Sequence, residues 1–272
     1  MDRNDLAIRM KNYENVSNIK LTNRSVVILR LDMRCGHIFT KGFVRPFDDV
    51  FIKSMQDTAK YLCENIQNVV MSYQQSDEIS LVLVDYDSIV KKPWFDNRIQ
   101  KLCSIAASMA TLAFNRKFVW HRAECLGSIN GNDLKQYNIY SSSVKRGATF
   151  DCRAFNLPKD EVANYMYWRQ EDAIRNSIQM VGQASFSHNE LQNKSCKDIK
   201  SMLIEQKNID WDNDLTTCHK RGSCCINEEY ITNDINNKDI QVIRHRWIID
   251  DEIPVFKNDG RKYVNSRILY ND

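Results

Sequence analysis

Apolar positions along the chain form short continuous runs that alternate with stretches of helical periodicity. Four runs rich in β-branched and aromatic residues predict strands, at 25–32, 69–73, 79–85 and 148–156. Apolar residues spaced by three and four positions predict helices over 46–67, with Pro46 in the first turn, and over 97–115. The polar stretch 127–147 reads as a loop. The predicted order is therefore strand, helix, strand, strand, helix, strand.

This order is the split βαββαβ arrangement, an antiparallel ferredoxin-like sheet with helices on one face. We therefore expect an α+β fold in which residues 1–157 form a palm-like catalytic domain. Further helices are predicted over 158–181 and 196–207, followed by charged turns and a strand candidate at 240–249. Residues 158–272 are thus expected to form a mostly helical second part. Polymerase palms, nucleotide cyclases and many binding modules share the arrangement, so the fold alone does not decide the function.

The composition narrows the class of protein. The 272 residues are 43% hydrophobic and 27% charged, as in a soluble globular protein, and the net charge of +3 excludes a histone-like polycation. There is no apolar run of 18 residues and the N-terminus is polar, so we expect a cytoplasmic protein without a membrane partner. The nine cysteines then read as reduced, mostly buried residues. A zinc site is a weak alternative at Cys218, His219, Cys224 and Cys225, which lack paired CxxC half-sites.

Candidate chemistry centres on three acidic residues. Asp32 ends the first predicted strand, while Asp77 and Glu78 lie in the turn of the predicted hairpin. In a βαββαβ sheet these residues meet at one end, where neighbouring carboxylates repel each other unless a cation lies between them. Mg²⁺ prefers such ligands, and two ions can clamp a phosphoryl displacement. Acidic residues in turns are also commonly solvated or capping groups, so the pattern alone leaves both readings open.

Several longer motifs occur in a defined order along most of the chain. They are RLDMRCGHIFT with RPFD (30–40 and 45–48), YQQSDEISLVL (73–83), FDCRAFNLP (150–158), YWRQEDAIRNSI (167–178) and KRG (220–222). Together they resemble the tRNA-His guanylyltransferase family, and especially its tRNA-His guanylyltransferase-like branch. The resemblance covers about residues 9–222.

The resemblance implies an unusual nucleotidyltransferase. Members of the family add nucleotides to the 5′ end of tRNA in the 3′-to-5′ direction, after ATP or GTP has activated the 5′-phosphate. Two Mg²⁺ ions would be held by Asp32, Asp77 and the main-chain carbonyl of Met33, with Glu78 as the adjacent family acid. The partners implied are tRNA, ATP and GTP, and the family often forms homotetramers.

By the same resemblance, the nucleotide-binding positions are Arg30, Asp32, Met33, Arg34, Cys35, Gly36, His37, Arg45, Ser76, Asp77, Lys101 and Asn176.

Two positions depart from the pattern of the family. Met33 replaces a glycine that would tolerate a strained backbone close to phosphate. Ile174-Arg175-Asn176-Ser177 stands where the eukaryotic guanylyltransferases carry His-Ile-Asn-Asn, which is the pattern of the like-protein branch. The sequence therefore favours template-dependent repair of tRNA 5′ ends. The alternatives are a dedicated tRNA-His guanylyltransferase and an RNA-binding module with impaired catalysis. The YWRQ and SDE motifs weigh against a nucleotide cyclase.

Overall fold

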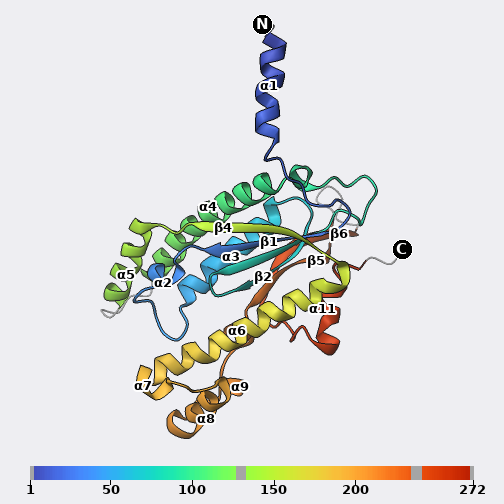
Figure 1. Cartoon of the computed structure of the whole chain (residues 1–272). Helices are drawn as coiled ribbons and strands as arrows, with labels where there is room; N and C mark the ends of the chain where they lie inside the picture. The colour runs from blue at the N-terminus through green and yellow to red at the C-terminus, as the bar shows by residue number, and fades with distance from the viewer. Residues whose placement is uncertain (1–2, 127–132, 234–240, 270–272) are drawn as a thin grey trace.

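A six-stranded antiparallel sheet organises the chain (Figure 1). The computed structural model describes residues 3–126, 133–233 and 241–269. The strand order is β4-β1-β3-β2-β5-β6. The strands are β1 (Val26–Met33), β2 (Val69–Gln75), β3 (Glu78–Leu83), β4 (Phe150–Leu157), β5 (Ser223–Asn233) and β6 (Gln241–Asp250). The first four confirm the predicted palm-like arrangement.

Helices α3 (Asp49–Asn65) and α4 (Ile99–Leu126) cover one face of this sheet. Leu29 and Leu31 of β1 point to this face and are fully buried beneath the helices. The Asp48 side chain accepts a hydrogen bond from the Phe51 N–H and so caps α3. The helix therefore begins three residues after Pro46, and the prediction that Pro46 lies in its first turn is wrong. A 3₁₀ turn (Trp94–Asn97) precedes α4.

The opposite face is covered by α6 (Val162–Ser185), which follows a 3₁₀ turn (Lys159–Glu161), and by α11 (Arg261–Asn265), which follows another (Asn258–Gly260). Because side chains alternate along a strand, Val26 and Ile28 point to this face. The second half of α6 extends beyond the sheet (Figure 1) and carries α7 (His188–Leu191), α8 (Cys196–Lys207) and α9 (Trp211–Asp214) around a third apolar cluster. Helix α10 (Thr217–Arg221) leads into β5.

The C-terminal part contributes strands as well as helices. Strand β5 pairs with β2 from Met71↔Ile226 to Gln74↔Ser223, and β6 extends the sheet beyond it. The candidate strand at 240–249 is thus confirmed as β6, whereas β5 was not predicted from the sequence. The division of the chain at residue 157 stays a prediction.

Several helices were not predicted from the sequence, and two of them lie near the catalytic end of the sheet. Helix α5 (Asp133–Arg146) lies where a polar loop was predicted over 127–147, and residues 127–132 are outside the described part of the chain. Helix α2 (Gly36–Phe39) is a single turn directly after β1. Figure 1 shows α2 and α5 side by side at one end of the sheet.

Helix α1 (Arg3–Asn15) projects away from the rest of the molecule (Figure 1). Its side chains from Asn4 to Asn15 are all exposed, including Leu6, Ile8 and Tyr13. Among the helices of the described residues, none combines the length and apolar character needed to cross a bilayer.

Candidate active site

Asp32, Asp77 and Glu78 converge at one end of the sheet, as the sequence predicts. Asp32 pairs in register with Glu78 of β3, and Asp77 lies in the two-residue turn between β2 and β3. The Met33 N–H donates a hydrogen bond to the Asp77 carbonyl at 3.0 Å. Burial and the nearby charge of Asp32 raise the pKa of Asp77, while burial and Asp151 raise that of Asp32. Two carboxylates that repel each other at a sheet end form a site suited to a cation.

Gly36 allows the backbone to approach the Asp77 carboxylate closely. A Cβ atom at this position would lie 2.0 Å from Asp77 Oδ2. The turn that brings Gly36 there is made by Cys35, whose φ of 57° is in the left-handed region. The backbone therefore turns sharply directly after β1 and begins α2 beside the carboxylate.

Met33 lies within β1 and not in a strained turn. Its side chain is 3% exposed and packs in the core beneath α3 and α4. The backbone at this position is an ordinary strand and does not need the conformational freedom of glycine. The left-handed residue is Cys35, two positions further on.

A cavity of about 510 Å³ opens beside Asp77. Its walls come from the segment after β1, from the β2–β3 turn, from α6 and from α10. Predicted residues that line it are Gly36, His37, Arg45, Ser76, Asp77 and Asn176. Lining residues that were not predicted to bind nucleotide include Lys41, Phe47, Met180, His219 and Arg221. Positive and aromatic side chains thus line the cavity away from the acidic end.

Six of the twelve predicted nucleotide-binding residues do not line the cavity. Asp32 and Met33 end β1 beside the β2–β3 turn that carries Asp77. Arg34 and Cys35 are exposed beside the cavity, and the Arg34 N–H is bonded to the Thr149 carbonyl. Arg30 turns toward Glu78. Lys101 is exposed on α4, which covers one face of the sheet. Arg30 and Asp32 point to the other face, which α6 covers. The structure of the single chain therefore does not bring Lys101 to the site.

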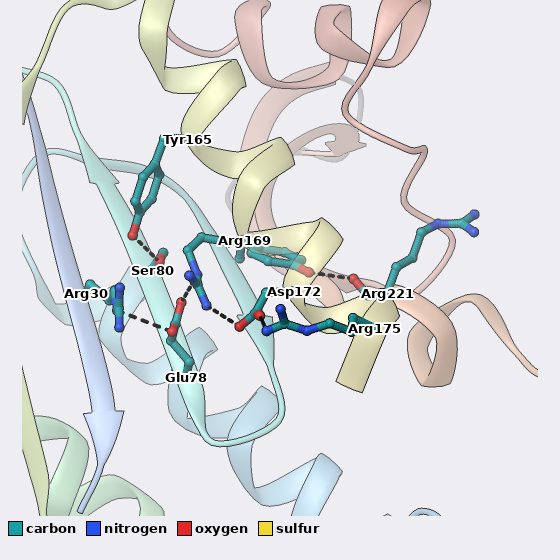
Figure 2. Close-up of polar contacts among 9 residues, drawn as sticks. Arg30, Glu78, Ser80, Tyr165, Arg169, Asp172, Arg175 and Arg221 are labelled. Atoms are coloured by element: carbon teal, nitrogen blue, oxygen red, sulfur yellow. Dashed lines mark hydrogen bonds and ion pairs between the residues drawn. The ribbon is translucent and has the colours of Figure 1, made fainter. Parts of the chain in front are cut away.

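Glu78 lies in a buried network of charged side chains, shown in Figure 2. Arg169 Nε donates to Glu78 Oε1 at 2.9 Å, and Arg30 Nε lies 3.2 Å from Oε2 without the alignment of a hydrogen bond. Arg169 Nη2 also donates a hydrogen bond to Asp172 Oδ2 at 2.7 Å. Asp172 in turn forms a salt bridge with Arg175. Burial raises the pKa of Glu78, although Arg169 and Arg30 act in the opposite direction. Glu78 therefore links β3 to α6 through its ion pair with Arg169, and it does not line the cavity.

A stacked aromatic pair closes the far part of the cavity. The rings of Phe47 and His219 are parallel within 6° and their centroids are 4.3 Å apart. Burial lowers the pKa of His219, which favours the neutral imidazole. Gly222 follows with a φ of 81°, and a Cβ there would lie 2.3 Å from the Gln74 carbonyl. The KRG motif at 220–222 was the sequence signal that pointed to this segment.

The donor set fits a hard cation better than zinc. Asp32 and Asp77 offer carboxylate oxygens, which Mg²⁺ prefers. Within the described residues, no three His, Cys, Asp or Glu side chains form a cluster for a metal ion, and the predicted ligand set needs only two carboxylates. Cys224 and Cys225 belong to cores on opposite faces of the sheet, so the four candidate zinc ligands do not converge.

A sequence profile described as tRNAHis guanylyltransferase matches residues 7–158, which is more than half of the chain. The chain belongs to the tRNA-His guanylyltransferase family. A probable tRNA(His) guanylyltransferase of Dictyostelium discoideum is 26% identical over 210 residues, which cover 72% of this chain and 73% of that protein. The tRNA(His) guanylyltransferase of Debaryomyces hansenii is 25% identical over 74% of this chain and 73% of its own length.

Solved structures of family members agree with this assignment. A bacterial tRNA(HIS) guanylyltransferase (Thg1)-like protein in complex with ATP superimposes with a TM-score of 0.80 and is 40% identical, covering 98% of this chain and all of that one. The Saccharomyces cerevisiae enzyme, at 18% identity and a TM-score of 0.58 over 84% of this chain and 91% of its own, shares the fold. Guanylyltransferases of this family are nucleotidyltransferases, and this chain is assigned to that enzyme class.

Proposed function

We propose that the protein adds nucleotides to the 5′ end of tRNA in the 3′-to-5′ direction and uses the opposite strand of the acceptor stem as a template. The observation that carries this proposal is the convergence of Asp32 and Asp77 at one end of the sheet, where Asp77 lines a cavity of about 510 Å³. A cavity of this size accommodates a nucleotide. Family membership supplies the class of reaction.

Asp32 and Asp77, with the main-chain carbonyl of Met33, would hold two Mg²⁺ ions. Such ions, when bound, neutralise phosphate charge and clamp the attacking and leaving oxygens of a phosphoryl displacement. Gly36 keeps the space beside the Asp77 carboxylate free of a side chain. Glu78 acts indirectly, because it holds α6 through Arg169 and thereby fixes the wall that carries Asn176.

The cavity is proposed to bind ATP for activation of the 5′-phosphate, and then the incoming nucleoside triphosphate. Relatives of known structure are complexes with ATP and with GTP, which supports both ligands. Lys41 and Arg45 line the cavity as exposed cations and would balance triphosphate charge. Activation joins the nucleoside monophosphate of ATP to the 5′-phosphate and releases pyrophosphate. In the second step, the 3′-hydroxyl of the incoming nucleotide attacks that 5′-phosphate, forms a phosphodiester bond and displaces AMP. The residues described here position the two reactants and exclude water.

The similarity to the bacterial like-protein favours templated repair over dedicated guanosine addition. The bacterial like-protein is 40% identical over nearly the whole chain, whereas the guanylyltransferases of Dictyostelium discoideum and Debaryomyces hansenii are 26% and 25% identical over about three quarters of it. At the end of the Ile174–Ser177 segment, Ser177 Oγ accepts a hydrogen bond from Trp211 Nε1 at 3.1 Å. Ser177 therefore packs α9 against α6, and both Asn176 and Ser177 line the cavity.

A homotetrameric assembly and a cytoplasmic setting are also part of the proposal. A homotetramer is supported by α1, whose exposed apolar side chains, such as Leu6 and Tyr13, find cover in an oligomer. A reducing, cytoplasmic setting is supported by the nine cysteines, all of which are free thiols. Residues 158–272 are proposed to complete the cavity and to contribute tRNA contacts, as a part distinct from the palm-like 1–157.

The test is nucleotide addition to a 5′-truncated tRNA with Mg²⁺, ATP and all four nucleoside triphosphates, followed by sequencing of the 5′ end. Asp32→Ala and Asp77→Ala should abolish addition without unfolding the protein, because each removes charge compensation worth several kcal/mol in the transition state. Asp259→Ala, which changes a fully exposed carboxylate, is the matched control and should retain activity. Activity of either site variant near that of the wild type would contradict the proposal. Binding of tRNA without any addition would indicate the impaired RNA-binding module instead.

A further inference from the structure

Positive charge is concentrated beside the catalytic end of the sheet. Residues 33–47 and 134–150 contain six Lys and Arg residues and no Asp or Glu. The whole chain has a net charge of only +3, so the rest of the chain is net negative. The six residues, here called the α5 surface, are Arg34, Lys41, Arg45, Lys135, Lys145 and Arg146.

The two segments are joined in space by hydrogen bonds from α5 to the segment after β1. Ser143 Oγ donates to the Phe39 carbonyl at 2.7 Å, and Arg146 Nη1 donates to the Ile38 carbonyl at 2.5 Å. Tyr140 and Ile139 extend the contact, since the Tyr140 hydroxyl donates to the Asp48 carboxylate at 2.7 Å and Ile139 packs on Gly42. Figure 1 shows α5 beside α2 at this end of the sheet. The α5 surface is therefore fixed relative to Asp32 and Asp77.

The cations of this surface are exposed and have no acidic partners among the described residues. Each of the six side chains is exposed, and none forms an ion pair with any described residue. Nine other Lys and Arg side chains of the described residues do form ion pairs, as in Lys117–Asp57 and Arg246–Glu228. Grouped, unpaired cations on a fixed surface are the footprint of a protein that binds the phosphates of a nucleic acid.

We propose that α5 binds the phosphate backbone of the RNA whose 5′ end reaches Asp32 and Asp77. Lys41 and Arg45 line the cavity and serve the nucleotide, whereas Lys135 and Lys145 are outside its lining. These two lysines are ten residues apart, or about 15 Å along the helix, so they contact different phosphates. Contacts to phosphate position the RNA without reading its sequence. This inference rests on the proposed function, because it assumes that RNA is the substrate.

The test compares Lys135→Gln/Lys145→Gln with the wild type by measuring the affinity for a 5′-truncated tRNA as a function of salt, and the affinity for ATP. We expect weaker tRNA binding for every sequence tested and a salt slope lower by about one for each lysine, because fewer counterions are released. ATP affinity should be unchanged. Lys135→Arg/Lys145→Arg should keep the slope of the wild type. Lys92→Gln/Lys262→Gln removes two exposed lysines away from α5 and should also keep it.

Each contrary outcome overturns the inference. An unchanged salt slope would show that α5 does not contact RNA. An equal loss of ATP affinity would assign the lysines to the nucleotide cavity, and a change in molecular mass in solution would assign α5 to a subunit interface. Circular dichroism checks that each variant is folded. If the wild type binds tRNA through α5 and yet adds no nucleotide, the proposed function fails while the RNA surface stands.

Discussion

Replacing Arg169 with methionine should strongly destabilise the protein, because it leaves Glu78 buried with one partner fewer. Both side chains are 7% exposed, and Arg169 Nε lies 2.9 Å from Glu78 Oε1. Removing one member of a buried ion pair costs about 3–5 kcal/mol. Glu78 keeps Arg30 at 3.2 Å, so we expect the lower end, about 3 kcal/mol, for Arg169→Met. Arg175→Met is the matched control, since Arg175 is 60% exposed and its pair with Asp172 is worth at most about 1 kcal/mol.

The loss of stability caused by Arg169→Met should be larger at high pH than at low pH. Burial already raises the pKa of Glu78 above its ordinary value of 4.5, and losing Arg169 raises it further. A carboxyl group whose pKa is higher in the folded state binds protons more tightly there, so the free energy of unfolding falls as the pH rises through that range. The free energy of unfolding that Arg169→Met loses relative to the wild type should therefore be largest above the raised pKa of Glu78. It should shrink as the pH is lowered toward 4.5.

The assay is urea unfolding at pH 8 and pH 5, with a chelator present and at a fixed protein concentration, followed by tryptophan fluorescence. The Glu78→Gln/Arg169→Met double variant should lose less stability than the sum of its two single variants, because both remove the same interaction. A deficit for Arg169→Met below about 1 kcal/mol, as for an exposed pair, would refute the reasoning. A deficit that grows as the pH falls would refute the proposed electrostatic cause.

Three further changes test the local geometry of the site. Gly36→Ala places a Cβ atom 2.0 Å from Asp77 Oδ2, so the carboxylate must move. The rate of nucleotide addition should therefore fall roughly a hundredfold, while the melting temperature changes little. Met33→Gly should destabilise the fold by at least about 2 kcal/mol in urea unfolding because it empties a core position, whereas Met33→Leu should cost less than about 1.5 kcal/mol. Tyr140→Phe removes a 2.7 Å hydrogen bond to the cap of α3 and should lower the free energy of unfolding by about 1 kcal/mol.

The palm-like half of the fold could be predicted because its signals are local. Buried strands such as 25–32 and 79–85 are continuous apolar runs, and α3 repeats apolar residues on one face. Helix α5 gave no such signal. Its sequence, DLKQYNIYSSSVKR, has three consecutive serines and few apolar residues, and its contacts with α2 are hydrogen bonds to main-chain carbonyls. Tertiary contacts of this kind leave no periodic pattern in a sequence.

The site could be predicted only in part for a similar reason. Asp32 and Asp77 follow from strand order, because both lie where paired strands end. The roles of Glu78 and Arg169 could not be predicted, since they depend on which face of β3 packs against α6. The Phe47–His219 stack joins residues far apart in the sequence, so only the folded chain reveals it. Lys101 was assigned by motif, and its place on α4 keeps it from the cavity of the same chain.

The most direct test of the central claim is to sequence the nucleotide added to a truncated tRNA while the templating base and the anticodon are varied independently. Specificity in a templated enzyme comes from base pairing, and the protein holds the stem by phosphate and shape contacts. The account predicts that the added nucleotide is always complementary to the templating base, that tRNAs of several identities are repaired, and that addition stops when the stem is complete. Addition of G alone, dependent on the His anticodon and indifferent to the template, would contradict the account and identify a dedicated tRNA-His guanylyltransferase.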